Sequence, residues 1–73
     1  MTELEFKLKT DQPYIELNKV LQILKVSQTG GHAKILIQNE EVFVNGQLET
    51  RVRKKLVKGD RIEIDEKIIS IQG

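Results

Sequence analysis

The chain has 73 residues, no Cys and a formal net charge of +1, which is enough for one small domain and excludes disulfides and thiolate metal sites. Its apolar runs are far shorter than the roughly 20 residues that span a bilayer, and its first residues lack the basic-then-apolar pattern of a signal peptide. We therefore expect residues 1–73 to form a single cytoplasmic domain with no membrane partner.

The first predicted element is a strand, because Leu4, Phe6 and Leu8 alternate with charged residues. A break over residues 10–13 ends this strand. An amphipathic helix is predicted from Pro13 to about residue 25, since proline is tolerated in a first helical turn. The apolar stripe of this helix recurs at spacings of three and four residues: Leu17, Val20, Leu21 and Leu24.

A second, shorter helix is predicted from about Gly30 to Asn39. The break before it contains two candidates for the N-cap, Ser27 and Thr29. Its apolar stripe consists of Ala33, Leu36 and Ile37.

A hairpin is predicted next. Val42 and Val44 alternate around Phe43, and the pair Asn45-Gly46 follows. Asn-Gly favours positive φ at both central positions of a tight turn. The return strand begins at about Leu48.

The rest of the chain is predicted as short strands and turns. Residues 51–58 form a loop or irregular strand, and turns are expected at residues 58–60 and 66–67. Ile62 with Ile64, and Ile69 with Ile71, mark the two final strands. The predicted fold class is α+β, with two helices packed on a small antiparallel sheet.

Charge is distributed unevenly along the chain. From Arg51 to Lys58 the sequence contains five basic residues and no acid, whereas acids gather near both ends and at residues 40–41. Screening confines surface charge effects to about 8–10 Å, so this stretch behaves locally like part of a basic protein. Its residues alone fit two interpretations: a phosphate-binding surface, or a solvated edge whose charges discourage aggregation.

Three pieces of sequence resemble a known family. Residues 29–37 contain Ala-x-x-Leu-Ile at the end of a short helix, residues 42–46 read Val-Phe-Val-Asn-Gly, and residues 58–64 contain Gly-Asp-x-Ile. In this order and at these intervals they resemble the ribosomal protein S-four type RNA-binding domain, also called the alpha-L motif. The resemblance covers about residues 14–64 and is greatest to short stand-alone members.

The resemblance implies RNA binding without chemistry of its own. The expected partner is structured RNA, ribosomal or transfer RNA, with the ribosome or its assembly intermediates as a further partner and the protein itself a monomer. Two positions depart from the family pattern. The family often has Ser-Arg where this chain has Thr29-Gly30, and Gly where it has Glu40.

The candidate RNA-binding residues fall into two groups. At the start of the second helix, free N–H groups and the helix dipole favour an anion, and glycines allow a phosphate to approach closely. The basic stretch supplies the cations. The alternatives are that the glycines form an ordinary interhelical turn and that the polar and charged side chains are simply exposed on the surface. The predicted contacts are Thr29, Gly30, Gly31, His32, Lys34, Asn45, Arg51, Arg53, Lys54, Lys55 and Lys58.

Phe43 and Asn45 each have a structural explanation that competes with a role in RNA binding. Phe43 points away from Val42 and Val44 in a regular strand, so it either stacks on an unpaired base or packs under a neighbouring segment. Asn45 is a turn former that could also donate to RNA.

No catalytic, metal or cofactor site is predicted. His32 is the sole histidine, and no acid or Ser is arranged with it in a recognisable triad. Two other functions remain open: an adaptor for protein partners, and a ubiquitin-like sulfur carrier. The carrier needs a Gly-Gly terminus, whereas this chain ends Ile71-Gln72-Gly73.

Overall fold

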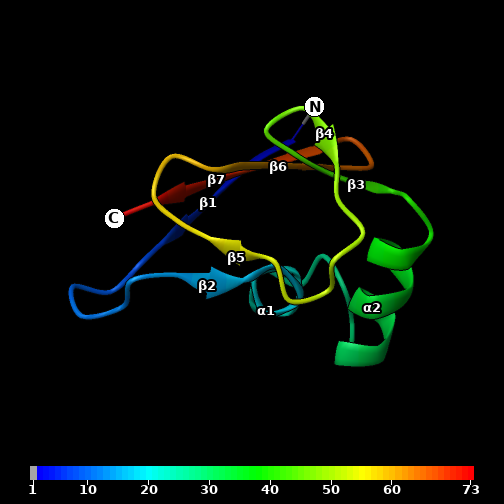
Figure 1. Ribbon diagram of the computed structural model, residues 1–73, viewed down its shortest axis with the longest axis horizontal. Helices are drawn as coiled ribbons and strands as arrows, with labels where there is room; N and C mark the ends of the chain where they lie inside the picture. Colours follow the sequence, from blue (N-terminus) through cyan, green and yellow to red (C-terminus); the bar gives the residue numbers. More distant parts are fainter. Residues whose placement is uncertain (1) are drawn as a thin grey trace.

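The computed structural model describes residues 2–73, and within them it contains two helices, a five-stranded sheet and a two-stranded sheet (Figure 1). The elements are β1 (Thr2–Lys7), β2 (Ile15–Glu16), α1 (Leu17–Ile23), α2 (Gly30–Gln38), β3 (Val42–Val44), β4 (Gln47–Leu48), β5 (Lys55–Leu56), β6 (Arg61–Ile64) and β7 (Lys67–Gln72). The helices and the β2–β5 pair lie on the same side of the larger sheet (Figure 1). The predicted α+β class with two helices on a sheet is confirmed.

The larger sheet has the strand order β1-β7-β6-β3-β4. Its β7–β6, β6–β3 and β3–β4 pairs are antiparallel, whereas β1 runs parallel to β7. The sheet is therefore mixed rather than wholly antiparallel as predicted. Period-two alternation is the same for both directions, so the sequence pattern did not contain this information. Because the two strands are parallel, Leu8, which directly follows β1, lies beside the end of β7, where its N–H donates to the Gln72 carbonyl at 2.6 Å. From there the chain crosses to the helical layer.

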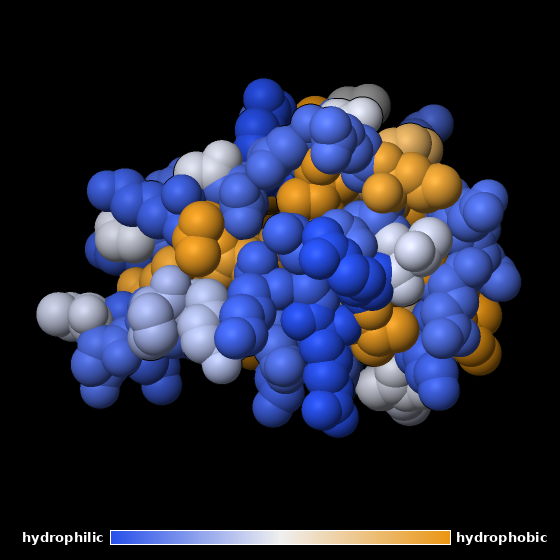
Figure 2. Space-filling model, viewed as in Figure 1, coloured by the Kyte–Doolittle hydropathy of each residue, from blue (hydrophilic) through white to orange (hydrophobic). Residues whose placement is uncertain are grey.

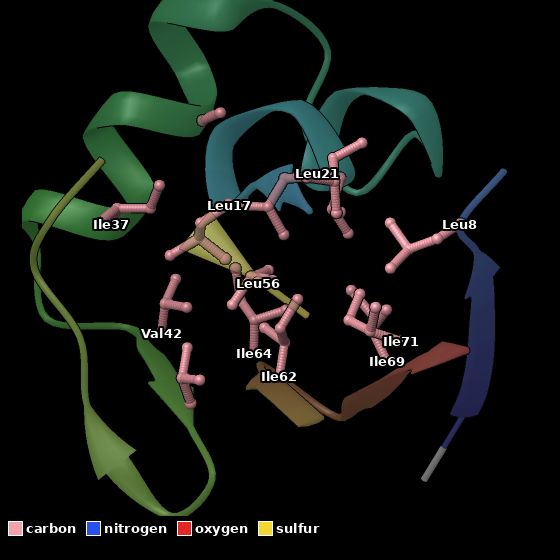
Figure 3. Close-up of a cluster of buried hydrophobic side chains, with 14 residues drawn as sticks. Leu8, Leu17, Leu21, Ile37, Val42, Leu56, Ile62, Ile64, Ile69 and Ile71 are labelled. Carbon is pink, nitrogen blue, oxygen red and sulfur yellow. The ribbon is translucent and has the colours of Figure 1, made fainter. Parts of the chain in front are cut away.

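A single apolar core fills the space between the two layers (Figure 3). Leu17 and Leu21 of α1 and Ile37 of α2 face Ile62, Ile64, Ile69 and Ile71 of the sheet, and Leu56 of β5 lies between them. Burial of each of these side chains stabilises the folded state by about 1.5–3 kcal/mol relative to leaving it exposed. The core is thus one two-layer cluster, with buried members from both helices and from β2, β3, β5, β6 and β7.

The first helix begins at Leu17, four residues after the predicted start at Pro13. Ile15 and Glu16 are extended and pair antiparallel with Leu56 and Lys55. Ile15 is 5% exposed and belongs to the core, which gives the extended segment its own apolar anchor. Long-range strand pairing therefore replaces the first helical turn that the sequence predicts.

Both helices end in a reversed turn made without glycine. Lys25 and Glu40 have φ of 59° and 63°, in the left-handed region. In both turns the N–H of this left-handed residue donates to the carbonyl three residues back. The N–H of the next residue donates to the carbonyl five residues back, which is the Schellman arrangement. Glycine is favoured at this position because it has no Cβ, so the Gly that the resemblance leads us to expect at position 40 would avoid this strain.

The predicted hairpin is confirmed, with φ of 53° at Asn45 and 81° at Gly46. The final turn occupies residues 65–66, one residue earlier than predicted. Phe43 is 40% exposed and pairs across the strands with Leu48, on the sheet face away from the helices. Within residues 2–73, no helix is long and apolar enough to cross a membrane.

Candidate nucleic-acid interface

The start of α2 presents backbone donors beside two glycines. Thr29 is extended and is the N-cap, and its Oγ1 accepts a hydrogen bond from the His32 N–H at 3.0 Å. The other N-cap candidate, Ser27, is 3% exposed and lies before the helix. Gly30 and Gly31 are exposed, and as residues of the first turn their N–H groups have no intrahelical acceptor. A positive dipole end is therefore accessible at this point of the surface.

The segment from Arg51 to Lys54 is fixed against the start of α1 by backbone hydrogen bonds. The N–H of Leu17 donates to the Lys54 carbonyl at 2.9 Å, and the N–H of Asn18 donates to the Val52 carbonyl at 3.1 Å. Glu16 makes no side-chain cap, so carbonyls from this distant segment cap the helix instead. This arrangement holds the basic residues at a defined position even though the segment is irregular.

A surface groove joins the two regions. It runs between the beginnings of both helices and the basic segment, and its lining residues are Asn18, Gly30, Gly31, Lys34, Val52 and Arg53. A second groove, lined by Arg51, Arg53, Lys54 and Lys55, adjoins it at Arg53. We call these two grooves together the basic face. Figure 2 shows hydrophilic side chains over the middle of the view, where the segment between β4 and β5 lies in front.

Arg51 is partly neutralised within the protein. Its Nε and Nη2 donate to the two carboxylate oxygens of Glu49 at 2.9 and 3.1 Å, and its backbone N–H also donates to Glu49 at 2.9 Å. These hydrogen bonds lower the pKa of Glu49 below its ordinary value, and they outweigh the opposing effect of burial. Glu49 is 8% exposed, so Arg51 is the cation of the segment least available to a phosphate.

Lys55 is oriented by an aromatic ring. Its Nζ lies 4.9 Å from the centre of the Tyr14 ring, within the range of a cation–π contact. The pairing of β2 with β5 brings these residues together from opposite parts of the chain. Tyr14 is 38% exposed, so it borders the basic face rather than belonging to the core.

The predicted contact Asn45 has a structural role. Its Nδ2 donates to Asp60 at 3.0 Å, and its Oδ1 accepts from the Arg61 N–H at 2.9 Å. Asp60 also accepts from the Val57 N–H at 2.9 Å. Hydrogen bonds thus connect the Val-Asn-Gly and Gly-Asp motifs, and we call this connection the Asn45–Asp60 clamp. Asn45 lines neither groove of the basic face.

His32 and Lys58 also lie apart from the basic face. His32 Nδ1 accepts from the Gln28 N–H at 3.1 Å, and its side chain borders a different groove with Leu36 and Glu41. Residues 32 and 36 share one side of α2, whereas residues 30 and 34 share another. Lys58 lines a separate groove at the end of β7. The structure therefore brings together seven predicted residues: Gly30, Gly31, Lys34, Arg51, Arg53, Lys54 and Lys55.

Three residues of this region were not predicted. Asn18 lines the groove, and its Oδ1 is buried with no hydrogen-bond partner among residues 2–73. Glu49 holds Arg51, and Tyr14 holds Lys55. Of these three, only Tyr14 could have been singled out from the sequence, because it is an aromatic residue at the start of a predicted helix. The roles of Asn18 and Glu49 depend on the path of the basic segment, which periodicity does not reveal.

Within residues 2–73, no group of three or more His, Asp or Glu side chains is placed to hold a metal ion. The grooves of the basic face are open and lined by cations and backbone donors. The chemistry that such a surface supports is the binding of anions.

Comparisons with known proteins identify the family of this chain. The model of the S4 domain family matches residues 6–72. RlbA of Bacillus subtilis, named a probable ribosome maturation protein, is 36% identical over 58 residues, which cover 80% of this chain and 82% of that protein. YbcJ of Escherichia coli is 40% identical over 50 residues, which cover 68% of this chain and 71% of that protein.

The fold agrees as well. The solution structure of YbcJ from Escherichia coli, described as having an alpha-L motif involved in RNA binding, superimposes with a TM-score of 0.73. The aligned region has 32% identity and covers 94% of this chain and 86% of that one. The family is one of RNA-binding domains that are typically non-catalytic. The chain belongs to the S4 domain family.

Proposed function

We propose that this protein binds structured RNA through phosphate contacts made by the basic face. The observation that carries the proposal is the attachment of residues 51–54 to the start of α1, which places Arg53 in one groove with Lys34 and the two glycines of α2. Cations and backbone N–H groups from three parts of the chain thereby converge on one strip of surface.

The chemistry of this strip fits a phosphate backbone better than base edges. Lys and Arg neutralise phosphates and release counterions, and the N–H groups at the start of α2 add a positive dipole end. A-form RNA hides its deep major groove, so double-stranded regions are recognised mainly by shape and backbone. The proposed contacts are Lys34, Arg53, Lys54 and Lys55, with Gly30 and Gly31 as backbone donors.

The absence of an Arg at position 30 fits this arrangement. A Cβ added at position 30 would lie 3.4 Å from Gln22 Nε2, an ordinary contact with the end of a flexible side chain, so space does not exclude a larger residue there. Lys34 lies one turn later on the same side of α2 and lines the same groove as Arg53. We infer that these two residues supply the charge that an Arg supplies in many family members.

The proposed RNA is ribosomal RNA, bound during assembly of the ribosome. The support is the relative RlbA, which is named for ribosome maturation. A cytoplasmic location and a ribosomal assembly intermediate as partner follow from this proposal. Neither the fold nor the relatives support the sulfur-carrier alternative, because two adjacent helices and an S4 domain match are not features of that class.

The test is a filter-binding titration against purified bacterial ribosomal RNA, with transfer RNA in a parallel series, at several salt concentrations. The test variant replaces Lys34, Arg53, Lys54 and Lys55 by Gln. The control variant removes exposed cations outside the basic face: Lys7, Lys25, Lys58 and Lys9 are replaced by Gln.

The test variant should lose most of its affinity, and the slope of log K against log salt should become shallower by up to about four. The control carries the same net charge as the test variant, but it should keep the affinity of the original protein because its substitutions lie outside the basic face. Equal losses in both variants would show non-specific attraction and contradict the proposal. Preference between the two RNAs decides between the ribosomal and transfer RNA alternatives.

A further inference from the structure

The sheet face away from the helices has a composition unlike that of the basic face. Five residues form a row across the strands, in the register Leu48–Phe43–Glu63–Ile68–Glu3. We call this the outer row. Leu48 and Phe43 are 46% and 40% exposed, Ile68 is half-buried, and both glutamates are exposed. The row therefore combines apolar surface with negative charge.

The charge at this end of the sheet is predominantly acidic. The outer row contains two glutamates and no base, and the adjoining β6–β7 turn adds Asp65 and Glu66. Lys67 lies within 3.9 Å of Asp65, which offsets one of these charges. The bases of this face, Lys7 and Arg61, are at the other ends of their strands.

We propose that the outer row is a docking site for a Lys- or Arg-rich protein segment that also carries apolar side chains. Charge complementarity selects the partner: basic groups pair with Glu63 and Glu3, while apolar groups cover Phe43, Leu48 and Ile68. Adjacent strands lie about 4.8 Å apart, so the row is about 19 Å long, the length of an extended segment of about six residues.

Two other occupants fit the row less well. RNA would bring phosphates against Glu63 and Glu3, which repel them. A second copy of this chain, related by a two-fold axis, would place the same acidic row against itself, and like charges directly opposite are destabilising. A basic segment is the occupant that satisfies both the apolar and the charged members.

This inference is independent of the proposed RNA contacts. The core of the protein separates the outer row from the helical layer (Figure 3). The protein would therefore hold RNA on one side and a basic protein segment on the other. The adaptor function predicted as an alternative from the sequence thus becomes a second activity on a different face.

The test is a titration of the isotopically labelled full chain, without RNA, followed by the shifts of its backbone amides. The main probe is a peptide of about ten residues in which pairs of Lys alternate with pairs of Leu, so that each side of the extended peptide carries both residue types. It is long enough to cross the row. In one control peptide Glu replaces Lys, and in another Gly replaces Leu. The variants are Glu3→Gln with Glu63→Gln, and as a matched control Asp11→Asn with Glu40→Gln, which removes the same charge from two exposed acids outside the outer row.

The expected result is saturable shifts at Phe43, Glu63 and Ile68 with the Lys–Leu peptide and with neither control peptide. Replacing both glutamates should weaken binding by about tenfold, whereas the control variant should bind as before. These glutamates are exposed, so their replacement leaves the core intact. An amide spectrum of each variant without peptide verifies that the fold is retained.

Several results would overturn the inference. Shifts spread over all acidic residues, or unaffected by the two glutamate substitutions, would indicate non-specific attraction. Shifts of the outer row on adding ribosomal RNA would assign this face to RNA. Shifts that grow with protein concentration alone would assign it to a second copy. Because no RNA is present in the peptide titration, its failure leaves the proposed RNA function untouched.

Discussion

The Asn45–Asp60 clamp and the segment from Arg51 to Lys55 are both polar parts of the surface, yet their polar groups make different contacts. In the clamp, the Asn45 amide and the Asp60 carboxylate bond to each other and to backbone N–H groups. In the segment, Arg53 and Lys54 have no ion-pair partner among residues 2–73, and only Arg51 is held by an acid.

This difference separates the residues that identify the family from those proposed to bind RNA. The Val-Asn-Gly and Gly-Asp motifs meet in the clamp and hold the β3–β4 turn against the start of β6. The basic segment has no such motif, but its backbone caps α1, and within residues 2–73 the side chains of Arg53 and Lys54 have no ion-pair partner. We infer that the clamp contributes stability and the segment contributes affinity.

The largest expected effect comes from reversing charge in the basic face. Lys34→Glu with Arg53→Glu should weaken binding to ribosomal RNA by about 100-fold, because two charge-assisted contacts of about 1.5 kcal/mol each are lost. Stability should change little, since both side chains are exposed. Titration of RNA binding and thermal unfolding of the same samples check this. A large loss of stability would break the proposed division of roles.

The next effect tests the clamp. Asp60→Ala removes the acceptor for Asn45 and for the Val57 N–H and should lower the free energy of unfolding by about 2 kcal/mol. Urea denaturation measures this change. RNA affinity, measured where the variant is folded, should stay the same. A fall comparable to that of the charge reversal would assign Asn45 and Asp60 to the RNA-binding surface.

A smaller effect is expected at Glu49, the acid that pairs with Arg51 of the basic segment. Glu49→Gln should lower the free energy of unfolding by about 1 kcal/mol at neutral pH, since a charge-assisted pair becomes a neutral one. It should also free Arg51, so RNA affinity should stay equal or rise. Weaker RNA binding by the folded variant would contradict this role of Glu49.

The pH dependence of stability follows from the same pair. The folded-state pKa of Glu49 is lowered from its ordinary value of 4.5. Its contribution is therefore complete above about pH 4.5 and is lost as the pH falls through the lowered pKa. Denaturation of the original protein and of Glu49→Gln should show a stability difference that shrinks below that pH. A constant difference would contradict this origin.

The smallest effect is expected at Glu40, which has φ of 63° at the end of α2. Glu40→Gly should raise the free energy of unfolding by about 0.5 kcal/mol, because relief of the left-handed strain exceeds the entropy cost of glycine. RNA affinity should hardly change, since the helix separates Glu40 from Gly30 by about 13 Å and salt screens that distance. Denaturation and RNA titration of this variant check both statements.

Much of the fold could be predicted because the periodic elements follow local rules. The alternation in β1, the helix after Thr29 and the Asn45-Gly46 turn occur as the sequence predicts. The predictions failed where distant segments meet. The start of α1 was wrong because Ile15 pairs with Leu56 instead, and β1 runs parallel to β7.

The candidate site could be predicted in composition but not in arrangement. The cations of residues 51–55 and the glycines of α2 share the basic face, whereas His32, Asn45 and Lys58 do not. Their role as RNA contacts stays a prediction. His32 lies on a different side of α2 from Gly30 and Lys34 because residues two apart on a helix point in nearly opposite directions, and Asn45 is held by Asp60, 15 residues away.

The sequence by itself determined which segments are helical or extended and which stretch is cationic, since these depend on neighbouring residues. Only the tertiary structure decided which cations are free and where they face. That outcome depends on pairs distant in the chain: the start of α1 with Val52 and Lys54, and Asn45 with Asp60. Such contacts form when apolar burial brings the layers together, and a local pattern does not encode them.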